Sequence, residues 1–479
     1  MALKDFISKI EENLYEISKD YKPEMLVPAR FYASPSMLED IIKDKSLEQL
    51  ANTATLKGIL KYALAMPDIH EGYGAPIGSV FATDLAEGLI SPGAVGYDIN
   101  CGVKLLRSEL FKTDLENHKE KLADLIFQTV PSGVGRGGYW RLSFKEMDEV
   151  LARGLDFLKQ KGYADNEDLN YCESRGSLTS ASSEAVSDLA KRRGLDQLGT
   201  IGAGNHFLEV QYVSEIYLRE EASKLGLKKD QITVLIHSGS RGLGHQVATD
   251  YIKKFGFLAS QYGISLVDRE LAAVPFSAKE GEAYFKAMQA AANFAWANRQ
   301  LITHLLRECF FKIFGSGGTL KSVYDVAHNI AKIEEHEIDG LKKKVLVHRK
   351  GATRSFPVYH PELPPDYLEI GQPVLIPGSM GTSSYLLLGD KKGKEAFYSS
   401  CHGAGRLMSR HEALKKLEGN KILKELTEKG VVARIHSIKG LAEEAAEVYK
   451  DVDEVVEVVA RSGLAKKVAQ FKPLIVIKG

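Results

Sequence analysis

The chain has 479 residues and a mass of 52.8 kDa, which allows about three domains at ~150 residues each. Its hydrophobic share of 44% and charged share of 26% exclude a disordered, collagen-like or coiled-coil protein. The 63 basic and 63 acidic side chains balance to a formal net charge of zero. A protein that coats nucleic acid over its whole surface is therefore not expected, and any such contact must come from a local basic patch.

The N-terminal segment and the cysteines indicate a cytoplasmic protein. No stretch approaches the ~18 apolar residues that span a bilayer, and the charges of Lys4, Asp5 and Lys9 argue against a signal peptide. The cysteines contain no C-x-x-C pair, which argues against a disulfide framework or a zinc knuckle. They lie far apart, at Cys101, Cys172, Cys309 and Cys401.

Apolar spacing predicts helices in the N-terminal third of the chain. A first helix is expected over 6–17 and a second over 37–52. Between 62 and 103, glycines interrupt short apolar runs, which indicates short strands and tight turns. Helical periodicity then returns in three segments, at about 111–128, 145–161 and 181–193.

The middle of the chain contains clearer signals. The β-branched run 231–236 predicts a buried strand that ends at His237, and an Ala-rich helix is expected over about 279–313. Runs 331–338 and 341–348 are joined by Asp339-Gly340, a dipeptide favoured in two-residue hairpin turns.

The C-terminal part alternates short strands with helices. Strands are expected at 373–376, 384–388, 396–399 and 474–477, and helices at about 443–450 and 452–461. Hairpins mixed with helices of unequal length favour an α+β fold over a doubly wound sheet.

Common nucleotide-binding motifs are missing. The sequence has no G-x-x-x-x-G-K-[ST] and no K-x-D-G run. The glycines at 133, 135, 137 and 138 lack the following apolar helix of a dinucleotide site, so a flexible loop is the better interpretation. If the protein activates a nucleotide covalently, the nucleophile is not a lysine in that motif.

Four of the thirteen histidines stand where an apolar or small-residue run meets Gly, Ser or Asn. Small neighbours allow a metal or phosphate to approach an imidazole, and a strand end holds it rigidly. One such histidine is more often structural, but four alike favour a site. They are His206, His237, His328 and His402, whereas His118, His304 and His411 lie in helical stretches and are expected to be packed or solvated.

A carboxylate and a thiol occur together in the turn that contains Asp98 and Cys101. A thiolate, imidazoles and a carboxylate form a ligand set for a first-row transition metal, and by ligand type alone zinc is expected. The alternative is a buried cysteine beside a turn-forming aspartate.

Seven runs together resemble those of the RtcB family of RNA-splicing ligases, in order from about residue 60 to the C-terminus. They are DINCG (98–102), GAGNHFLE (202–209), HSGSRG (237–242), VAHN (326–329), HRKGATR (348–354), PGSMGT (377–382) and HGAGR (402–406).

The resemblance implies one large RtcB-like catalytic domain over 1–479, with mixed β-sheets flanked by helices around a deep metal-containing cleft. Residues 1–55 are expected to form a helical segment packed on it. The implied activity is GTP- and Mn²⁺-dependent joining of RNA 2′,3′-cyclic phosphate or 3′-phosphate ends to 5′-hydroxyl ends, in tRNA splicing and RNA repair. RNA and GTP are the implied partners, an archease-type activator is a further candidate, and a monomer is expected.

The resemblance also implies residue roles. His402 would carry GMP, and Cys101 would bridge two manganese ions, one shared with Asp98 and His206 and the other with His237 and His328. The residues implied in the GTP pocket are Asn205, His206, Phe207, Leu208, Glu209, His328, Asn329, Pro377, Gly378, Ser379, Met380, Ser383, His402, Gly403, Ala404, Gly405, Tyr449 and Lys478.

RNA requires local positive charge, and arginine offers phosphate a bidentate fork. The candidate RNA contacts are Arg192, Arg193, Arg241, Arg349, Lys350, Arg354, Arg406 and Arg410, with Arg241 and Arg406 nearest in sequence to the proposed chemistry. Two other classes stay open: a dinuclear metal phosphoesterase that acts on RNA ends without ligation, and a non-catalytic RNA-binding or scaffold protein, which would leave the metal-ligand set unexplained.

Overall fold

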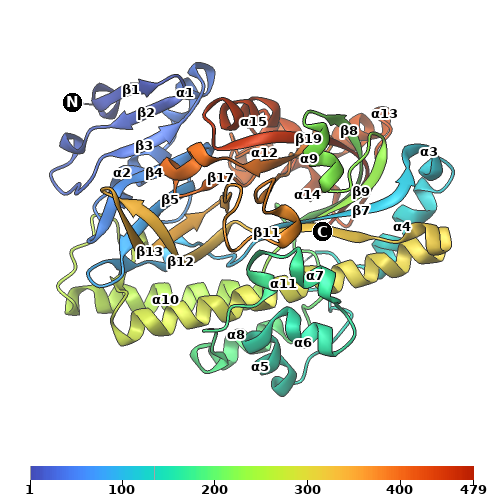
Figure 1. Cartoon of the computed structure of the whole chain (residues 1–479), viewed down its shortest axis with the longest axis horizontal. Helices are drawn as coiled ribbons and strands as arrows, with labels where there is room; N and C mark the ends of the chain where they lie inside the picture. The colour runs from blue at the N-terminus through green and yellow to red at the C-terminus, as the bar shows by residue number, and fades with distance from the viewer. Residues whose placement is uncertain (1, 134) are drawn as a thin grey trace.

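The computed structural model describes residues 2–133 and 135–479, whose strands form two large sheets and two small ones. The first large sheet has seven strands and contains the N-terminal strands, at the upper left of Figure 1. Its hairpin β12 (Asn329–Ile338) to β13 (Leu341–Lys350) turns at Asp339-Gly340, as the sequence predicts. In spatial order the strands are β1 (Ile7–Glu11), β2 (Leu14–Ile17), β3 (Ala29–Tyr32), β4 (Ile59–His70), β5 (Ile77–Asp84), β13 (Leu341–Lys350) and β12 (Asn329–Ile338).

The second large sheet has eight strands and lies on the side of the molecule that contains the C-terminal strand (Figure 1). Its path is β11 (Lys321–Ala327), β7 (Gly102–Phe111), β9 (Gln231–Ser238), β8 (Phe207–Ile216), β19 (Ala465–Lys478), β16 (Ser384–Gly389) and β15 (Pro373–Ile376), and β18 (Val432–Ile435) pairs with β19. The two small sheets are β6 (Leu89–Ile90) with β10 (Val274–Pro275), and β14 (Ala352–Arg354) with β17 (Ser399–Cys401).

The predicted Ala-rich helix is α11 (Lys279–Phe314), which crosses the molecule beneath the sheets (Figure 1). Its middle part is buried on every face, as expected for a helix inside a core. The helices packed against it include α4 (Lys119–Thr129), α5 (Phe144–Arg153), α6 (Leu155–Gln160) and α10 (Arg241–Gln261). The remaining helices are α1 (Pro35–Ile41), α2 (Ser46–Thr53), α3 (Lys112–Leu115), α7 (Asn166–Asn170), α8 (Asp188–Gly194), α9 (Arg219–Lys224), α12 (Arg410–Lys416), α13 (Gly419–Glu428), α14 (Ile438–Ala442) and α15 (Val452–Arg461).

The hydrophobic core is divided among these layers. One part lies between the seven-stranded sheet and α15, a second surrounds α10 and α11, and a third fills the space between the eight-stranded sheet and α4. Within residues 2–133 and 135–479, no helix combines the length and apolar character needed to cross a bilayer.

Several local predictions were wrong. Segments 111–128 and 145–161 each form two helices instead of one, and segment 181–193 is α-helical only from Asp188. Segment 6–17 forms the β1–β2 hairpin, because Glu12-Asn13 makes a turn and Leu14, Tyr15 and Ile17 are buried as part of a strand. Segment 37–52 is split between α1 and α2, and segment 443–450 contains only a short 3₁₀ turn. The strand expected at 396–399 is displaced to β17, because Phe397 and Tyr398 have positive φ angles that a strand cannot accommodate. The N-terminal segment is therefore partly β and partly helical, and not helical throughout.

Candidate metal centre and nucleotide pocket

The antiparallel order of the eight-stranded sheet brings four chain segments to one edge. The starts of β7 and β8 and the ends of β9 and β11 are neighbours, since Gly102 pairs with Ser238 and Ala327, and Phe207 pairs with His237. Cys101 and His206 directly precede β7 and β8, His237 is the penultimate residue of β9, and His328 directly follows β11. The predicted ligands therefore meet because of sheet register, although 230 residues separate Asp98 from His328.

The donor atoms form two groups that share Cys101: Asp98, Cys101 and His206, and Cys101, His237 and His328. The Cys101 Sγ lies 3.3 Å from Nε2 of both His206 and His237. The His237 and His328 Nε2 atoms are 3.3 Å apart, and His206 Nε2 is 2.7 Å from Asp98 Oδ2. We call these five side chains the donor cluster. Their donor atoms lie close enough together to bind shared metal ions.

Backbone hydrogen bonds hold the donor cluster together. The His328 N–H donates to the Cys101 carbonyl (2.9 Å), and the Asn100 N–H donates to the Asn329 carbonyl (2.7 Å). Asn100 has a φ of +51°, a left-handed conformation that asparagine tolerates better than most residues. The turn before β7 is thus bonded directly to the segment after β11.

The electrostatics of the cluster fit a bound cation. Burial, with the neighbouring imidazoles, holds the pKa of His237 and His328 well below the usual value, so both rings are neutral at pH 7, as metal ligands would have to be. Burial and the Asp98 carboxylate raise the pKa of Cys101, and a coordinated metal would reverse this by stabilising the thiolate. Burial alone would raise the pKa of Asp98, but His206 lowers it.

His402 lies beside this cluster, with its ring centroid 5.0 Å from that of His328. Its Nδ1 is 2.6 Å from Oδ2 of Asp68, a buried residue of β4. The same oxygen accepts from the backbone N–H of His402 and of Gly403. Burial alone would raise the pKa of Asp68, but His402 lowers it. An ionised carboxylate on Nδ1 leaves the lone pair of His402 on Nε2.

A pocket opens at His402. It is bordered by residues from both large sheets and from the C-terminal segment: His70, Asn205, Phe207, His237, Pro377, Gly378, Ser379, Met380, His402, Gly403, Ala404, Gly405, Arg406, Glu444, Tyr449 and Lys478. Most of the predicted GTP contacts are on this wall. His206 and His328 lie in the donor cluster, and Leu208, Glu209, Asn329 and Ser383 lie outside the wall.

The C-terminal strand takes part in the pocket. Lys478 pairs with Phe207 in the sheet, and its Nζ donates to the Gly204 carbonyl (2.6 Å). The tail is therefore docked, and Lys478 is 4% exposed. Next to it, burial raises the pKa of Glu209 to about 8, against the opposing effects of Gln211 and Lys478.

Sequence reasoning missed Asp68, His70, Glu444 and Lys450. The Lys450 Nζ donates to the carbonyls of Pro67 (3.0 Å) and Ile69 (2.6 Å), on either side of Asp68. A usable signal was the Pro67-Asp68-Ile69-His70 run, in which two titratable residues directly follow an apolar stretch.

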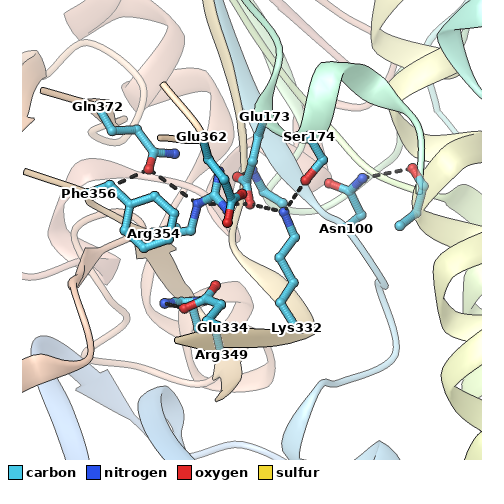
Figure 2. A network of polar contacts seen from close by, with 12 residues as sticks. Asn100, Glu173, Ser174, Lys332, Glu334, Arg349, Arg354, Phe356, Glu362 and Gln372 are labelled. Atoms are coloured by element: carbon cyan, nitrogen blue, oxygen red, sulfur yellow. Dashed lines mark hydrogen bonds and ion pairs between the residues drawn. The ribbon is translucent and has the colours of Figure 1, made fainter. Parts of the chain in front are cut away.

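Three of the predicted RNA contacts are contradicted by burial. Figure 2 shows Arg349 paired with Glu334, and Arg354 paired with Glu362. Arg349 and Arg354 are at most 1% exposed, and Lys350 donates to the carbonyls of Tyr73, Ala75 and Gly93. Their donors are used inside the protein, which argues against contact with RNA.

The other basic candidates lie at or near the surface. Arg192, Arg193 and Arg410 are exposed, and Arg410 approaches Asn205 at the pocket (3.5 Å). Arg241 donates to Thr200 Oγ1 (3.0 Å). Arg406 donates to the Tyr449 hydroxyl (3.0 Å) and the Glu443 carbonyl (2.9 Å), so it braces the pocket wall.

A cluster of metal donors beside a carboxylate-bound histidine and a pocket is typical of a metal-dependent enzyme. A family model described as tRNA-splicing ligase RtcB matches residues 49–479. The tRNA-splicing ligase RtcB of Thermococcus kodakarensis is 50% identical over 477 residues, or 99% of each chain. That of Archaeoglobus fulgidus is 50% identical over 483 residues, or 100% of each chain, and that of Aeropyrum pernix is 49% identical over 476 residues, or 98% of this chain and 99% of the relative. The chain belongs to the RtcB family of tRNA-splicing ligases, and it is an enzyme.

Proposed function

We propose that this RNA ligase joins an RNA end bearing a 2′,3′-cyclic phosphate or 3′-phosphate to a 5′-hydroxyl RNA end, with GTP as the energy source, in tRNA splicing and RNA repair. The observation that carries the proposal is the position of His402, bound through Nδ1 to Asp68 and 5.0 Å from the ring of His328 in the donor cluster. A reactive imidazole nitrogen next to a metal-donor set suits nucleotidyl transfer.

The donor cluster would hold two manganese ions. Asp98, Cys101 and His206 would hold one, and Cys101, His237 and His328 would hold the other, so Cys101 belongs to both donor groups. When bound, the ions would neutralise phosphate charge and orient the leaving group. Manganese is proposed from the family resemblance, because the ligand types alone favour zinc.

His402 would act as the nucleophile. Its Nε2 lone pair would attack the α-phosphorus of GTP, forming an N–P bond as the bond to the pyrophosphate oxygen breaks. Asp68 would hold the Nδ1 proton and stabilise the positive charge that develops on the ring, as carboxylates do for catalytic histidines. Gly403 would leave room for the phosphate, since only the Pro377 carbonyl lies within 4 Å of a Cβ placed there.

The remaining steps transfer GMP to RNA. A cyclic phosphate would first be hydrolysed to a 3′-phosphate, whose oxygen would then take GMP from His402 and regenerate the free imidazole. The 5′-hydroxyl would attack the activated 3′-phosphorus and release GMP. A free 3′-phosphate is a poor electrophile, so guanylylation supplies the leaving group. RNA would approach through Arg192, Arg193 and Arg410, which are exposed, and through the partly exposed Arg241.

Intact-mass spectrometry after incubation with GTP and Mn²⁺ tests this proposal. The parent chain should gain the mass of one GMP, and His402→Ala should not. No gain in the parent would contradict the ligase mechanism, and phosphate release from RNA ends without GMP transfer would favour the phosphoesterase alternative. An equal gain in the variant would contradict the role of His402. The cytoplasmic location, the monomeric state and an archease-type activator stay predictions.

A further inference from the structure

The central helix α11 carries buried polar side chains in the middle of an apolar core. Asn298 and Arg299 are both 0% exposed. Burying a guanidinium is costly unless its charge and its hydrogen-bond donors are satisfied. Their partners therefore indicate what the two residues do.

The Arg299 guanidinium connects three separate chain segments. Its Nε donates to Asp325 Oδ1 (2.8 Å), and its Nη1 donates to the carbonyls of Asn100 (2.9 Å) and Ser238 (2.9 Å). Its Nη2 donates to Asn100 Oδ1 (3.1 Å). Asn100 is tied to α11 a second time, because its Nδ2 donates to the Ala292 carbonyl (2.7 Å; Figure 2).

Each acceptor lies in a segment that carries a member of the donor cluster or leads directly to one. Asn100 directly precedes Cys101, and Ser238 directly follows His237. Asp325 lies on β11, the strand that ends immediately before His328. Gly102 leaves space for the guanidinium, because a Cβ there would lie 2.9 Å from Arg299 Cζ. Arg299 thus contacts the segments that carry Cys101, His237 and His328, one of the two donor groups.

Asn298 makes equivalent contacts on the neighbouring side. Its Oδ1 accepts from the N–H groups of Gly199 (2.8 Å) and Thr200 (3.0 Å), at the start of the segment that leads to His206. Its Nδ2 donates to Thr200 O (3.0 Å) and Gly239 O (3.2 Å). Two adjacent side chains of one helix therefore anchor the backbone around the donor cluster.

We propose that Arg299 is a positioning residue for the metal centre: its planar fork sets the spacing of Cys101, His237 and His328 without itself binding the metal. This rests on the proposed function, because it assumes that the donor cluster binds metal. Lysine has a compact charge and cannot reproduce contacts with one carboxylate and two carbonyls that point in different directions. Arg299→Lys is therefore the informative change.

Arg307 is a matched control on the same helix. It forms a two-point ion pair with buried Asp168 (both contacts 2.7 Å) and donates from Nε to the Leu320 carbonyl (3.0 Å). Its acceptors do not adjoin the donor cluster. Arg307→Lys thus removes a comparable fork at the start of β11, the opposite end of that strand from His328.

Cobalt(II) titration of the full chain tests the inference, with the thiolate-to-cobalt absorption band as the readout. The parent should show the band, and Cys101→Ser should lose it. Arg299→Lys should bind cobalt at least about 10-fold more weakly, the lower end of the loss seen when outer residues of metal sites are changed, with a weaker band. Arg307→Lys should match the parent in both.

The possible failures can be told apart. A parent band with unchanged cobalt affinity and spectrum in Arg299→Lys would overturn this inference alone. Absence of the band in the parent would overturn the metal centre and this inference with it. If Arg299→Lys does not fold, Asp325→Asn loosens the same guanidinium and should also weaken cobalt binding, and parent-like binding there would equally overturn the inference.

Discussion

The donor cluster and the Asp68–His402 pair are neighbours, but they are built in different ways. The donor cluster comes from the ends of adjacent strands of one sheet, where register and backbone bonds set each position. The pair joins β4 of the other large sheet to the segment after β17 through the Asp68 carboxylate, across 334 residues. Single substitutions should therefore separate metal binding from the reactivity of His402.

The largest effect is expected for Asp68→Asn. The carboxylate accepts from His402 Nδ1 and from two backbone N–H groups, and an amide lacks the charge that stabilises a positive ring. GMP transfer to His402 should slow by at least about 100-fold, within the range of acid–base effects, while manganese content stays at the parent level. Rapid-quench measurement of GMP incorporation, with elemental analysis of the same samples, checks both. Loss of metal in Asp68→Asn would show that the pair and the donor cluster are one unit.

Cys101→Ser tests metal binding by the donor cluster. Cys101 belongs to both donor groups, so its loss should weaken manganese binding at both sites. The affinity should fall by at least roughly 100-fold, the upper loss seen when residues that hydrogen-bond to metal ligands are changed. Asp98→Asn, which belongs to one group, should weaken one site and serves as the matched control. Isothermal titration with Mn²⁺ measures both. Parent-like stoichiometry and affinity in Cys101→Ser would contradict the shared sulfur.

Sequence reasoning predicted the donor cluster better than the pair. Cys101, His206, His237 and His328 lie at or next to strand ends and Asp98 lies in the turn before β7, and the small residues beside them can be recognised in the sequence. Asp68 lies inside the long buried strand β4, and its link to His402 depends on packing between distant segments. The predicted RNA contacts of Arg349 and Arg354 have the same weakness. A basic run in the sequence does not show that Glu334 and Glu362 pair with these arginines in the fold. Long elements such as α11 and the β12–β13 hairpin were predicted well because their signals are local.

Two glycines that follow His402, Gly403 and Gly405, should separate an effect on stability from an effect on GMP incorporation. Gly405 has a φ of +80°, and a Cβ there would overlap the Asp68 carbonyl, whereas a Cβ on Gly403 would meet only Pro377 O at 3.5 Å. Gly405→Ala should lower the free energy of unfolding by about 2–4 kcal/mol through backbone strain and overlap. Gly403→Ala should change it by less than about 1 kcal/mol and still reduce GMP incorporation. Urea denaturation measures stability, and equal losses in both variants would contradict the distinction.

The smallest effect concerns Glu209 of β8, three residues after His206, whose pKa burial raises from the usual 4.5 to about 8. A raised pKa means that the folded state holds the proton more tightly than the unfolded state. The stabilisation from Glu209 is therefore complete below pH 4.5 and is lost as the pH rises through 8. Between pH 6 and 8 the loss of this stabilisation should lower the free energy of unfolding of the parent by about 2 kcal/mol, at 1.36 kcal/mol per pKa unit. Glu209→Gln should remove that part of the pH dependence in urea denaturation, whereas Glu215→Gln, at an exposed position of the same strand, should keep it. A parent-like pH slope in Glu209→Gln would mean that Glu209 is ionised in the fold, which would favour a charged role at the pocket over a neutral one in the sheet.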